Sequence, residues 1–137
     1  MKIIALKGPN SCGKTTTLNL VYDELDKRGA TIHSAVKLPV VTKNKDFECI
    51  INYGSLQVAI YSMGDYSRLT TAKIKEYGLI GVDVLIIATN DRFVRPTILI
   101  TSFTNHHIIT KTIASPKTHS NIISANTIDC NTIISHI

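Results

Sequence analysis

The sequence has 137 residues, of which 44% are hydrophobic and 18% are charged, and its formal net charge at pH 7 is +5. This length and composition predict one folded domain over residues 1–137, and they exclude a disordered, collagen-like or coiled-coil chain. No apolar run approaches the roughly 18 residues that cross a bilayer, and lysines interrupt the first residues too early for a signal peptide. The three cysteines lack the spacing of a disulfide framework or a zinc site. We therefore expect a cytoplasmic protein with no membrane partner.

The positive charge favours anionic partners in general, but it does not distinguish a nucleotide from nucleic acid. The sequence has no Lys/Arg-rich run and no basic residues interleaved with aromatic ones, so nucleic acid is not the expected partner. Beyond Arg95, only Lys111, Lys117 and Asp129 are charged. This charge-poor region indicates either a simple residue bias or a face that docks on a partner, for example in a homodimer.

The first part of the chain alternates strand-like and helix-like segments. Residues 2–7 form a short apolar run that is typical of a buried strand. Residues 14–28 carry apolar side chains at helical spacing and are followed by Gly29, so we expect a helix that ends there. Its apolar face consists of Leu18, Val21, Tyr22 and Leu25. Residues 31–36 predict a second strand.

The middle of the chain has a different pattern. Residues 46–62 have the form of two strands around a tight turn, which predicts an antiparallel hairpin. A helix is expected over 67–77, with Asp65 or Ser67 as its cap and Gly78 as its end.

The last part returns to alternation. Residues 82–88 are the clearest buried parallel strand. Residues 96–105 fit a strand or a helix, and we expect a helix because two parallel strands need a crossover. A last strand is expected over 107–114 and a last helix over 118–136. The whole pattern predicts a three-layer α/β fold, with a mostly parallel sheet of about five strands and one antiparallel hairpin strand.

The 8–15 segment, which reads Gly-Pro-Asn-Ser-Cys-Gly-Lys-Thr, matches the pattern GxxxxGK(S/T). Its glycines let successive backbone N–H groups converge on one anion, and the helix that follows directs its N-terminus at the same place. The Lys14 ammonium would meet the outer phosphates of a nucleotide, and the Thr15 hydroxyl would ligate Mg²⁺. The expected nucleotide-binding residues are Gly8, Asn10, Ser11, Cys12, Gly13, Lys14, Thr15 and Thr16.

On this motif the chain resembles the P-loop NTPase superfamily, in its small kinase and GTPase-like branch. The specific resemblance covers residues 3–28, and the rest agrees only in the alternation of elements. It implies the P-loop fold, ATP or GTP as ligand and Mg²⁺ as cofactor. It also implies an acidic residue near the end of a neighbouring strand.

Asp65 is the candidate for this acidic residue. It departs from the simple pattern of an aspartate that directly ends an apolar strand, because it follows Gly64. It could ligate the metal, orient water, act as a base or only cap the next helix. Asp83 stands at the start of its strand, away from the edge where phosphate chemistry sits, and is expected to be structural.

The hairpin before Asp65 is similar to the switch region of Ras-like GTPases. The DxxG motif of those proteins is missing, however, and residues 89–92 have the wrong spacing for their guanine-binding NKxD motif. A true GTPase is therefore not expected.

Small-molecule and nucleotide kinases are the other relatives that the resemblance implies. Their phosphoryl transfer depends on positioning and on charge stabilisation by the loop lysine, Mg²⁺ and mobile arginines. Arg92 follows the strand over 82–88 and is the first candidate arginine, whereas Arg95 and Arg68 are alternatives; each could equally be a solvated surface residue. The expected catalytic residues are Lys14, Asp65 and Arg92, and the expected metal ligands are Thr15 and Asp65.

Three lesser features remain. Residues 115–119 follow the last strand, where proteins of this superfamily often contact the base, so they are candidates for a base pocket. Cys12 lies at a helix N-terminus, where a thiol pKa tends to fall, but it fits equally as a tolerated small residue. His106 and His107 have no spaced partners for a metal site and are expected to begin a strand.

The sequence therefore predicts a protein that binds a nucleoside triphosphate and catalyses Mg²⁺-dependent phosphoryl transfer, as a kinase of an unknown small-molecule acceptor or as a slow NTPase. The alternative is a non-catalytic switch, in which nucleotide orders residues 37–55 and 63–68 for a protein partner. A nucleic-acid-associated NTPase is a third hypothesis, which the positive charge alone suggests.

Overall fold

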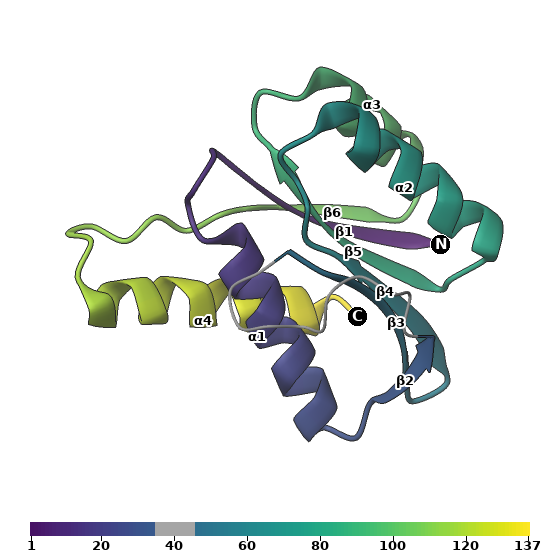
Figure 1. Ribbon diagram of the computed structural model, residues 1–137, viewed down its shortest axis with the longest axis horizontal. Coiled ribbons are helices and arrows are strands. Elements are labelled where there is room, and N and C mark those ends of the chain that lie inside the picture. Colours follow the sequence, from purple (N-terminus) through teal and green to yellow (C-terminus); the bar gives the residue numbers. More distant parts are fainter. Residues whose placement is uncertain (35–45) are drawn as a thin grey trace.

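The computed structural model describes residues 1–34 and 46–137, which form an α/β fold with six strands and four helices (Figure 1). The strands are β1 (Lys2–Gly8), β2 (Thr31–Ser34), β3 (Glu48–Tyr53), β4 (Leu56–Tyr61), β5 (Val84–Asn90) and β6 (His106–Thr110). The helices are α1 (Lys14–Lys27), α2 (Ser67–Ile80), α3 (Val94–Ser102) and α4 (His119–Ser135). None of the described helices is both long and apolar enough to span a membrane.

The strands form one mixed sheet in the order β2-β3-β4-β5-β1-β6. β4, β5, β1 and β6 pair in parallel, and β3 runs antiparallel to both of its neighbours. The expected single antiparallel strand is therefore confirmed. The expected number of about five strands is one too low, because the short β2 and both strands of the hairpin join the same sheet.

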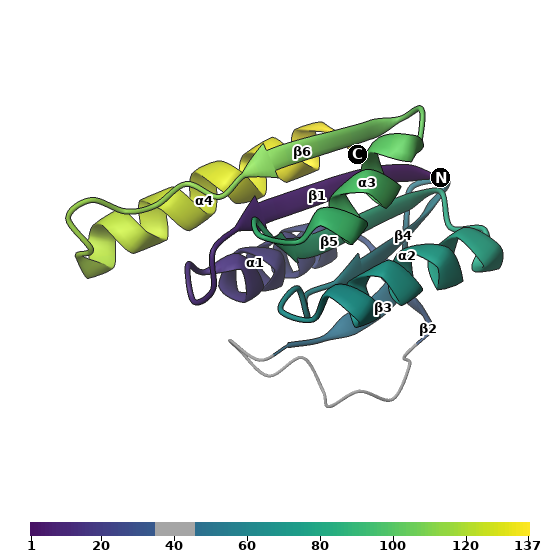
Figure 2. The ribbon, with the colours of Figure 1, turned by 90° about the horizontal axis from the view of Figure 1, so that it is seen from above.

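Both faces of the sheet are covered, which explains why β1 is apolar at successive positions rather than alternating. Ile3 and Ala5 belong to the core under α2 and α3, whereas Ile4 and Leu6 belong to the core under α1 and α4. Figures 1 and 2 show α1 and α4 on one face and α2 and α3 on the other. A strand that is buried on both faces cannot move without disturbing two cores, so the loop after β1 starts from a fixed point.

The helices expected over 14–28 and 67–77 both form, but α2 has a different end. α1 buries its apolar stripe, and Gly29 follows it with φ of +94°. α2 continues through Gly78 to Ile80, and Gly81 ends it with φ of +84°. Gly78 was the expected end and is wrong: it keeps a helical conformation, and Gly81 takes the left-handed one, from which the N–H groups of Gly81 and Val82 donate to the Tyr77 carbonyl oxygen.

The elements of the last part also form, with shifted limits. The ambiguous 96–105 region contains the helix α3, which begins two residues earlier than expected. β6 ends at Thr110 rather than at residue 114: the Lys111 N–H still donates to the Lys7 carbonyl oxygen of β1, but the Thr112 N–H donates to Asp129 on α4. The last helix agrees with its prediction, and the Thr118 hydroxyl caps it by accepting a hydrogen bond from the Asn121 N–H. For the second strand, residues 35 and 36 lie outside the described residues.

The parallel strands place several loops at one edge of the sheet. β1, β4, β5 and β6 all end at this edge, so the segments that follow them, 9–13, 62–66, 91–93 and 111–118, emerge there. The first part of α4 projects beyond the same edge (Figure 2). In open α/β sheets, ligands bind outside the carboxyl ends of the parallel strands, so this edge is the place to look for a site.

Candidate functional site

The 8–15 segment connects the end of β1 to the start of α1. Gly13 precedes the helix with φ of +95°, in the left-handed region that favours glycine. No side chain caps α1, so the N–H groups of its first turn, which lack partners within a helix, face the loop. The strand, tight loop and uncapped helix that the motif needs are therefore all present.

Gly8 is the point where this segment approaches β6. A Cβ atom on Gly8 would lie 2.8 Å from the Cβ of Lys111 and 2.9 Å from the Sγ of Cys12. Such distances are too short for carbon atoms that are not bonded, so any side chain here would push the loop away from Lys111. Glycine is required at this position by packing rather than by its backbone angles.

Lys14 is buried although it carries a charge. It is 6% exposed, and its Nζ donates hydrogen bonds to the carbonyl oxygens of Gly8 at 3.0 Å and Pro9 at 2.6 Å. Within residues 1–34 and 46–137, no carboxylate forms an ion pair with this ammonium. A buried charge is stable only when hydrogen bonds and an opposite charge offset its loss of water. The described residues give Lys14 the hydrogen bonds without the opposite charge.

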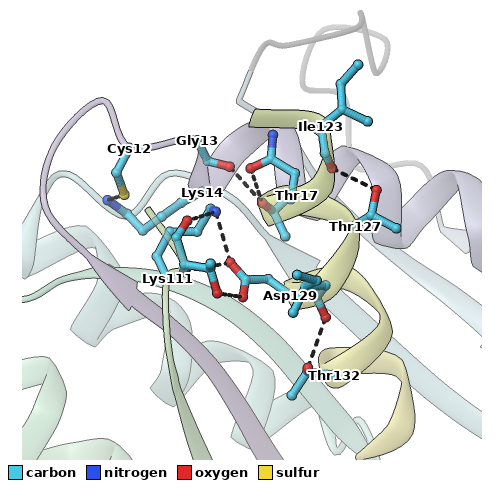
Figure 3. Close-up of polar contacts among 12 residues, drawn as sticks. Cys12, Gly13, Lys14, Thr17, Lys111, Ile123, Thr127, Asp129 and Thr132 are labelled. Carbon is cyan, nitrogen blue, oxygen red and sulfur yellow. Dashed lines mark hydrogen bonds and ion pairs between the residues drawn. The ribbon is translucent and has the colours of Figure 1, made fainter. Parts of the chain in front are cut away.

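A second buried lysine, Lys111, lies below the same loop and is neutralised by the protein (Figure 3). Its Nζ is 2.9 Å from Oδ2 of Asp129 on α4 and donates to the Thr112 carbonyl oxygen at 2.7 Å. Asp129 also accepts hydrogen bonds from the Thr112 N–H at 2.8 Å and from its hydroxyl at 2.6 Å. Lys111 is thus a structural cation, in contrast to Lys14.

The loop is also held by β5. Asn90, the last residue of β5, donates from its side chain to the side-chain oxygen of Asn10. Its own Oδ1 accepts from the N–H of Arg92 at 2.9 Å, and the N–H of Asp91 donates to the Gly8 carbonyl oxygen at 3.2 Å. In the sequence, Asn90 stands out only as part of a mismatched guanine-binding motif, whereas in the structure it holds the loop in place.

Asp46 is a site residue that the sequence did not reveal. Its Oδ1 accepts a hydrogen bond of 2.7 Å from the hydroxyl of Thr15, which lies 31 residues earlier in the chain. The same oxygen accepts from the hydroxyl of Ser62 at 3.2 Å. No local pattern marks Asp46, because the contact depends on how the hairpin places the start of β3 beside α1.

A hollow of about 360 Å³ opens at the start of α1. It is lined by residues 11–16 together with Ser62, Gly64 and Asp65. The structure therefore brings Asp65 to the same hollow as Lys14 and Thr15, as the sequence predicted.

The 62–65 turn reaches this hollow by crossing the end of β5. A Cβ on Gly64 would lie 2.7 Å from the backbone carbonyl of Ala88, so only glycine allows the crossing. α2 then begins without a side-chain cap. The alternative roles of Asp65 and Ser67 as helix caps are therefore wrong.

A second hollow, of about 460 Å³, lies on the other side of the loop, between residues 9–13 and α4. Apolar walls with a few polar groups are typical of small-molecule sites. The 115–119 segment was the candidate for a base pocket, and of its residues Lys117 lines this hollow. The hollow is also lined by residues 112–114 and by α4, which no sequence pattern indicated. The apolar walls are Ile113, Ala114, Ile122 and Ala125, and Asn126 is polar.

Asn126 joins this second hollow to the loop. Its Oδ1 lies 3.2 Å from the hydroxyl of Thr17, which also donates to the Gly13 carbonyl oxygen at 2.8 Å. A Cβ on Gly13 would lie 3.0 Å from the same Asn126 oxygen. The position of α4 and the shape of the loop are therefore coupled.

The candidate arginines do not enter either hollow. Arg92 is exposed at the edge where β5 ends, and its side chain lines neither the first nor the second hollow of the described residues. Arg68 is exposed in the first turn of α2 and also lines neither. Arg95 lines a separate hollow of about 350 Å³ with Lys75 between α2 and α3. The expected catalytic role of Arg92 stays a prediction that the geometry does not support.

The remaining candidates lie at other places. The Asp83 carboxylate accepts the N–H of Gln57 at 2.8 Å at the opposite edge of the sheet, which fits a structural role. His106 and His107 begin β6 as expected, and the ring of His107 stacks on His136 with centroids 4.1 Å apart.

The donors in the first hollow suit a hard cation. Hydroxyl and carboxylate oxygens, such as those of Thr15 and Asp65, are the ligands that Mg²⁺ prefers. Among the described residues, no group of three or more His, Cys, Asp or Glu side chains could hold a metal ion. Mg²⁺ usually binds through one or two carboxylates together with substrate phosphates, so these residues fit an ion that arrives with a phosphate ligand.

The comparisons add no relative: no protein-family model matches the chain, and neither a curated protein nor a solved structure matches it.

Proposed function

We propose that the 8–15 segment binds the phosphates of a nucleoside triphosphate with Mg²⁺, and that the chain has the three-layer fold of P-loop NTPases. The proposed activity is phosphoryl transfer from ATP or GTP, to a small acceptor or to water. The single observation that carries this proposal is the buried ammonium of Lys14, which has carbonyl partners but no carboxylate partner among the described residues.

Lys14 and Lys111 differ in how the protein compensates their charge. Both lysines are buried under the same loop, at 6% and 3% exposure. The protein gives Lys111 a carboxylate, and a lysine without one is stabilised by any anion that reaches it. Because Lys14 also lines the hollow at the start of α1, that anion would come from solution.

The backbone around Lys14 supports an anion of phosphate type. The N-terminus of a helix carries a partial positive charge and unpaired N–H groups, which together favour a phosphate. α1 presents such an end without a side-chain cap. Gly8 lines neither hollow, and its close packing on Lys111 supports the proposal only by holding the start of the loop in place.

The two hollows support a nucleotide rather than inorganic phosphate. They share Ser11, Cys12, Gly13 and Thr16, so they meet at the loop. The polar one would take the phosphates and Mg²⁺, with Thr15 and Asp65 as oxygen ligands. The more apolar one, beside α4, would take the base and sugar. When bound, Mg²⁺ would neutralise charge on the phosphates, while Lys14 holds their outer oxygens.

A non-catalytic switch is the second candidate. The contact between Thr15 and Asp46 favours it, because this contact ties the site to the start of β3 and hence to the hairpin. Of the residues that the switch hypothesis invokes, 37–45 lie outside the described residues. The two candidates differ in turnover, which a switch does not need.

The test is equilibrium binding of ATP and GTP with Mg²⁺, followed by phosphate release from whichever nucleotide binds. We expect wild type and Lys27→Ala, which removes an exposed lysine from the other end of α1, to bind equally. Lys14→Ala should lose binding. Equal binding by Lys14→Ala would refute the site. If nucleotide binds and phosphate release stays at the uncatalysed rate with a panel of acceptors, the switch is favoured over phosphoryl transfer.

A further inference from the structure

The strand that leads toward Asp65 ends in a hydroxyl rather than in a carboxylate. β4 is a buried parallel strand that ends at Tyr61, and the next residue is Ser62, which is 2% exposed. Asp65 follows three residues later, beyond the turn at Gly64. The place directly after the strand, where a carboxylate could face the start of α1, is therefore filled by a neutral side chain.

A carboxylate reaches this place from a neighbouring strand. Asp46 lies two residues before β3, and its Oδ1 accepts hydrogen bonds from Ser62 at 3.2 Å and from Thr15 at 2.7 Å. The Ser62 oxygen in turn accepts the N–H of Phe47 at 2.7 Å. Ser62 thus uses its hydroxyl both to hold the start of β3 and to fix the Asp46 carboxylate beside Thr15.

This arrangement orients the Thr15 hydroxyl. A hydroxyl has one hydrogen and two lone pairs. Because the hydrogen of Thr15 is directed to Asp46, its lone pairs remain for a cation in the hollow that Thr15 lines. The second oxygen of Asp46, Oδ2, has no hydrogen bond to the described residues, so it can accept one from a water molecule on that cation.

We propose that Asp46, held by Ser62, is the residue that positions a divalent cation of the Mg²⁺ type at Thr15. This inference rests on the proposed nucleotide site, because the cation arrives with the phosphates. Asp46 does not line the hollow and acts through Thr15, so it is a positioning residue and not a catalytic one. Asp65 lines the hollow but has no contact with Thr15 among the described hydrogen bonds.

The test separates binding of the cation from binding of the nucleotide. The affinity of a fluorescent ATP analogue is measured in EDTA and over a Mg²⁺ titration, for wild type, Asp46→Ala, Asp46→Asn and Asp23→Ala. Asp23 is an exposed aspartate on α1 and provides the matched control for the loss of one negative charge. Unfolding curves confirm that each variant is folded, which the exposure of Asp46 favours.

We expect Asp46→Ala to raise the Mg²⁺ concentration at half-maximal effect by about 10- to 100-fold, the usual effect of losing a partner of a metal ligand. Its affinity in EDTA should not fall. Asp46→Asn keeps an acceptor for Thr15 and loses the charge, so it should lie between Asp46→Ala and wild type. Ser62→Ala should shift the Mg²⁺ midpoint in the same direction.

Two results would overturn the inference in distinguishable ways. If wild type binds the analogue and responds to Mg²⁺, but Asp46→Ala has the same Mg²⁺ midpoint, Asp46 has no positioning role and the nucleotide site stands. If wild type binds no analogue with or without Mg²⁺, the proposed function fails and the role of Asp46 fails with it.

Discussion

The carboxylate of Asp129 and the ammonium of Lys111 form an ion pair of 2.9 Å that joins α4 to the end of β6. Both side chains are almost fully buried, at 3% and 1% exposure. The pair lies under the 9–13 loop, and Thr112 completes it with two hydrogen bonds to Asp129. It therefore fixes the floor of the loop and one wall of the second hollow.

Removing one partner of this pair should be strongly destabilising. Asp129→Ala leaves Lys111 as a buried cation without a counter-charge, so we expect the free energy of unfolding to fall by about 3–5 kcal/mol. Lys111→Met should cost less, since Asp129 keeps its bonds to Thr112. Urea denaturation measures both.

The control for this prediction is the exposed pair between Arg28 and Glu24 on α1. Because exposed pairs contribute little, Glu24→Gln should change the free energy of unfolding far less than Asp129→Ala does. An equally small change for Asp129→Ala would show that the buried pair does not stabilise the fold.

Gly8→Ala tests the close approach of the loop to β6. The added Cβ would meet the Lys111 Cβ at 2.8 Å, so we expect a loss of about 1–3 kcal/mol from overpacking and weaker nucleotide binding. Gly29→Ala is the control, because nothing lies within 4 Å of its Cβ position. It should lower stability through its positive φ and leave nucleotide binding unchanged. If both variants bind nucleotide like wild type, the tight packing at Gly8 does not shape the site.

Cys12 provides a chemical probe of the loop. It is partly exposed and lines both hollows. Burial raises the pKa of Cys49 to about 12 and that of Cys130 to about 11, and a thiol reacts as its thiolate. We expect a thiol reagent near pH 8 to modify one cysteine in the native protein, and Cys12→Ala to abolish this reaction.

The same reaction reports on the ligand. ATP or GTP with Mg²⁺ should slow the modification of Cys12, because the loop would be covered. Mass spectrometry of the modified protein identifies the residue. Rapid modification of Cys49 or Cys130, or a rate that no nucleotide changes, would contradict this account.

The ring of His107 stacks on that of His136, and its surroundings predict that stability depends on pH. Burial lowers the pKa of His107 below its usual value, and the nearby charges of His136, Lys2 and His106 lower it further. The unfolded chain then binds the proton more readily than the folded one. The free energy of unfolding should therefore fall as pH decreases through the ordinary histidine pKa of about 6.5.

His107→Phe tests this pH dependence because it keeps an aromatic ring against His136 and removes the titrating group. Melting temperatures are measured at pH values above and below the histidine range. We expect the decrease on acidification to be smaller in His107→Phe than in wild type. The same decrease in both proteins would assign the effect to other groups.

Local patterns were sufficient for most of the fold. Three kinds of short-range signal predicted elements correctly: the 8–15 motif predicted the loop before α1, the apolar runs predicted β1 and β5, and the apolar stripe predicted α1. The end of α2 was misplaced because two glycines, Gly78 and Gly81, compete as stop signals. Leu79 and Ile80 between them are exposed, and it is Gly81 that takes the left-handed conformation at the helix end.

The site was predictable only where it is contiguous in the sequence. Asp46 contacts Thr15, which is 31 residues away in the sequence, and Asn90 contacts Asn10, which is 80 residues away. No spacing rule could reveal contacts over such separations. Arg92 was expected to be catalytic because it follows β5. Its position in the sequence shows at which edge of the sheet it lies, but not in which direction its exposed side chain points. The second hollow depends on how α4 lies against the loop, which is a tertiary property.

Thermal unfolding with nucleotides is the most direct test of the claim that the 8–15 segment binds a nucleoside triphosphate. Wild type and Lys14→Ala are compared with ATP, GTP and their diphosphates, each with Mg²⁺. A ligand at 100 times its dissociation constant adds about 2.7 kcal/mol, which corresponds to several degrees in a domain of this size. The account predicts a nucleotide-selective increase in wild type that is absent in Lys14→Ala. An equal increase in both proteins, or none with any nucleotide, would contradict it.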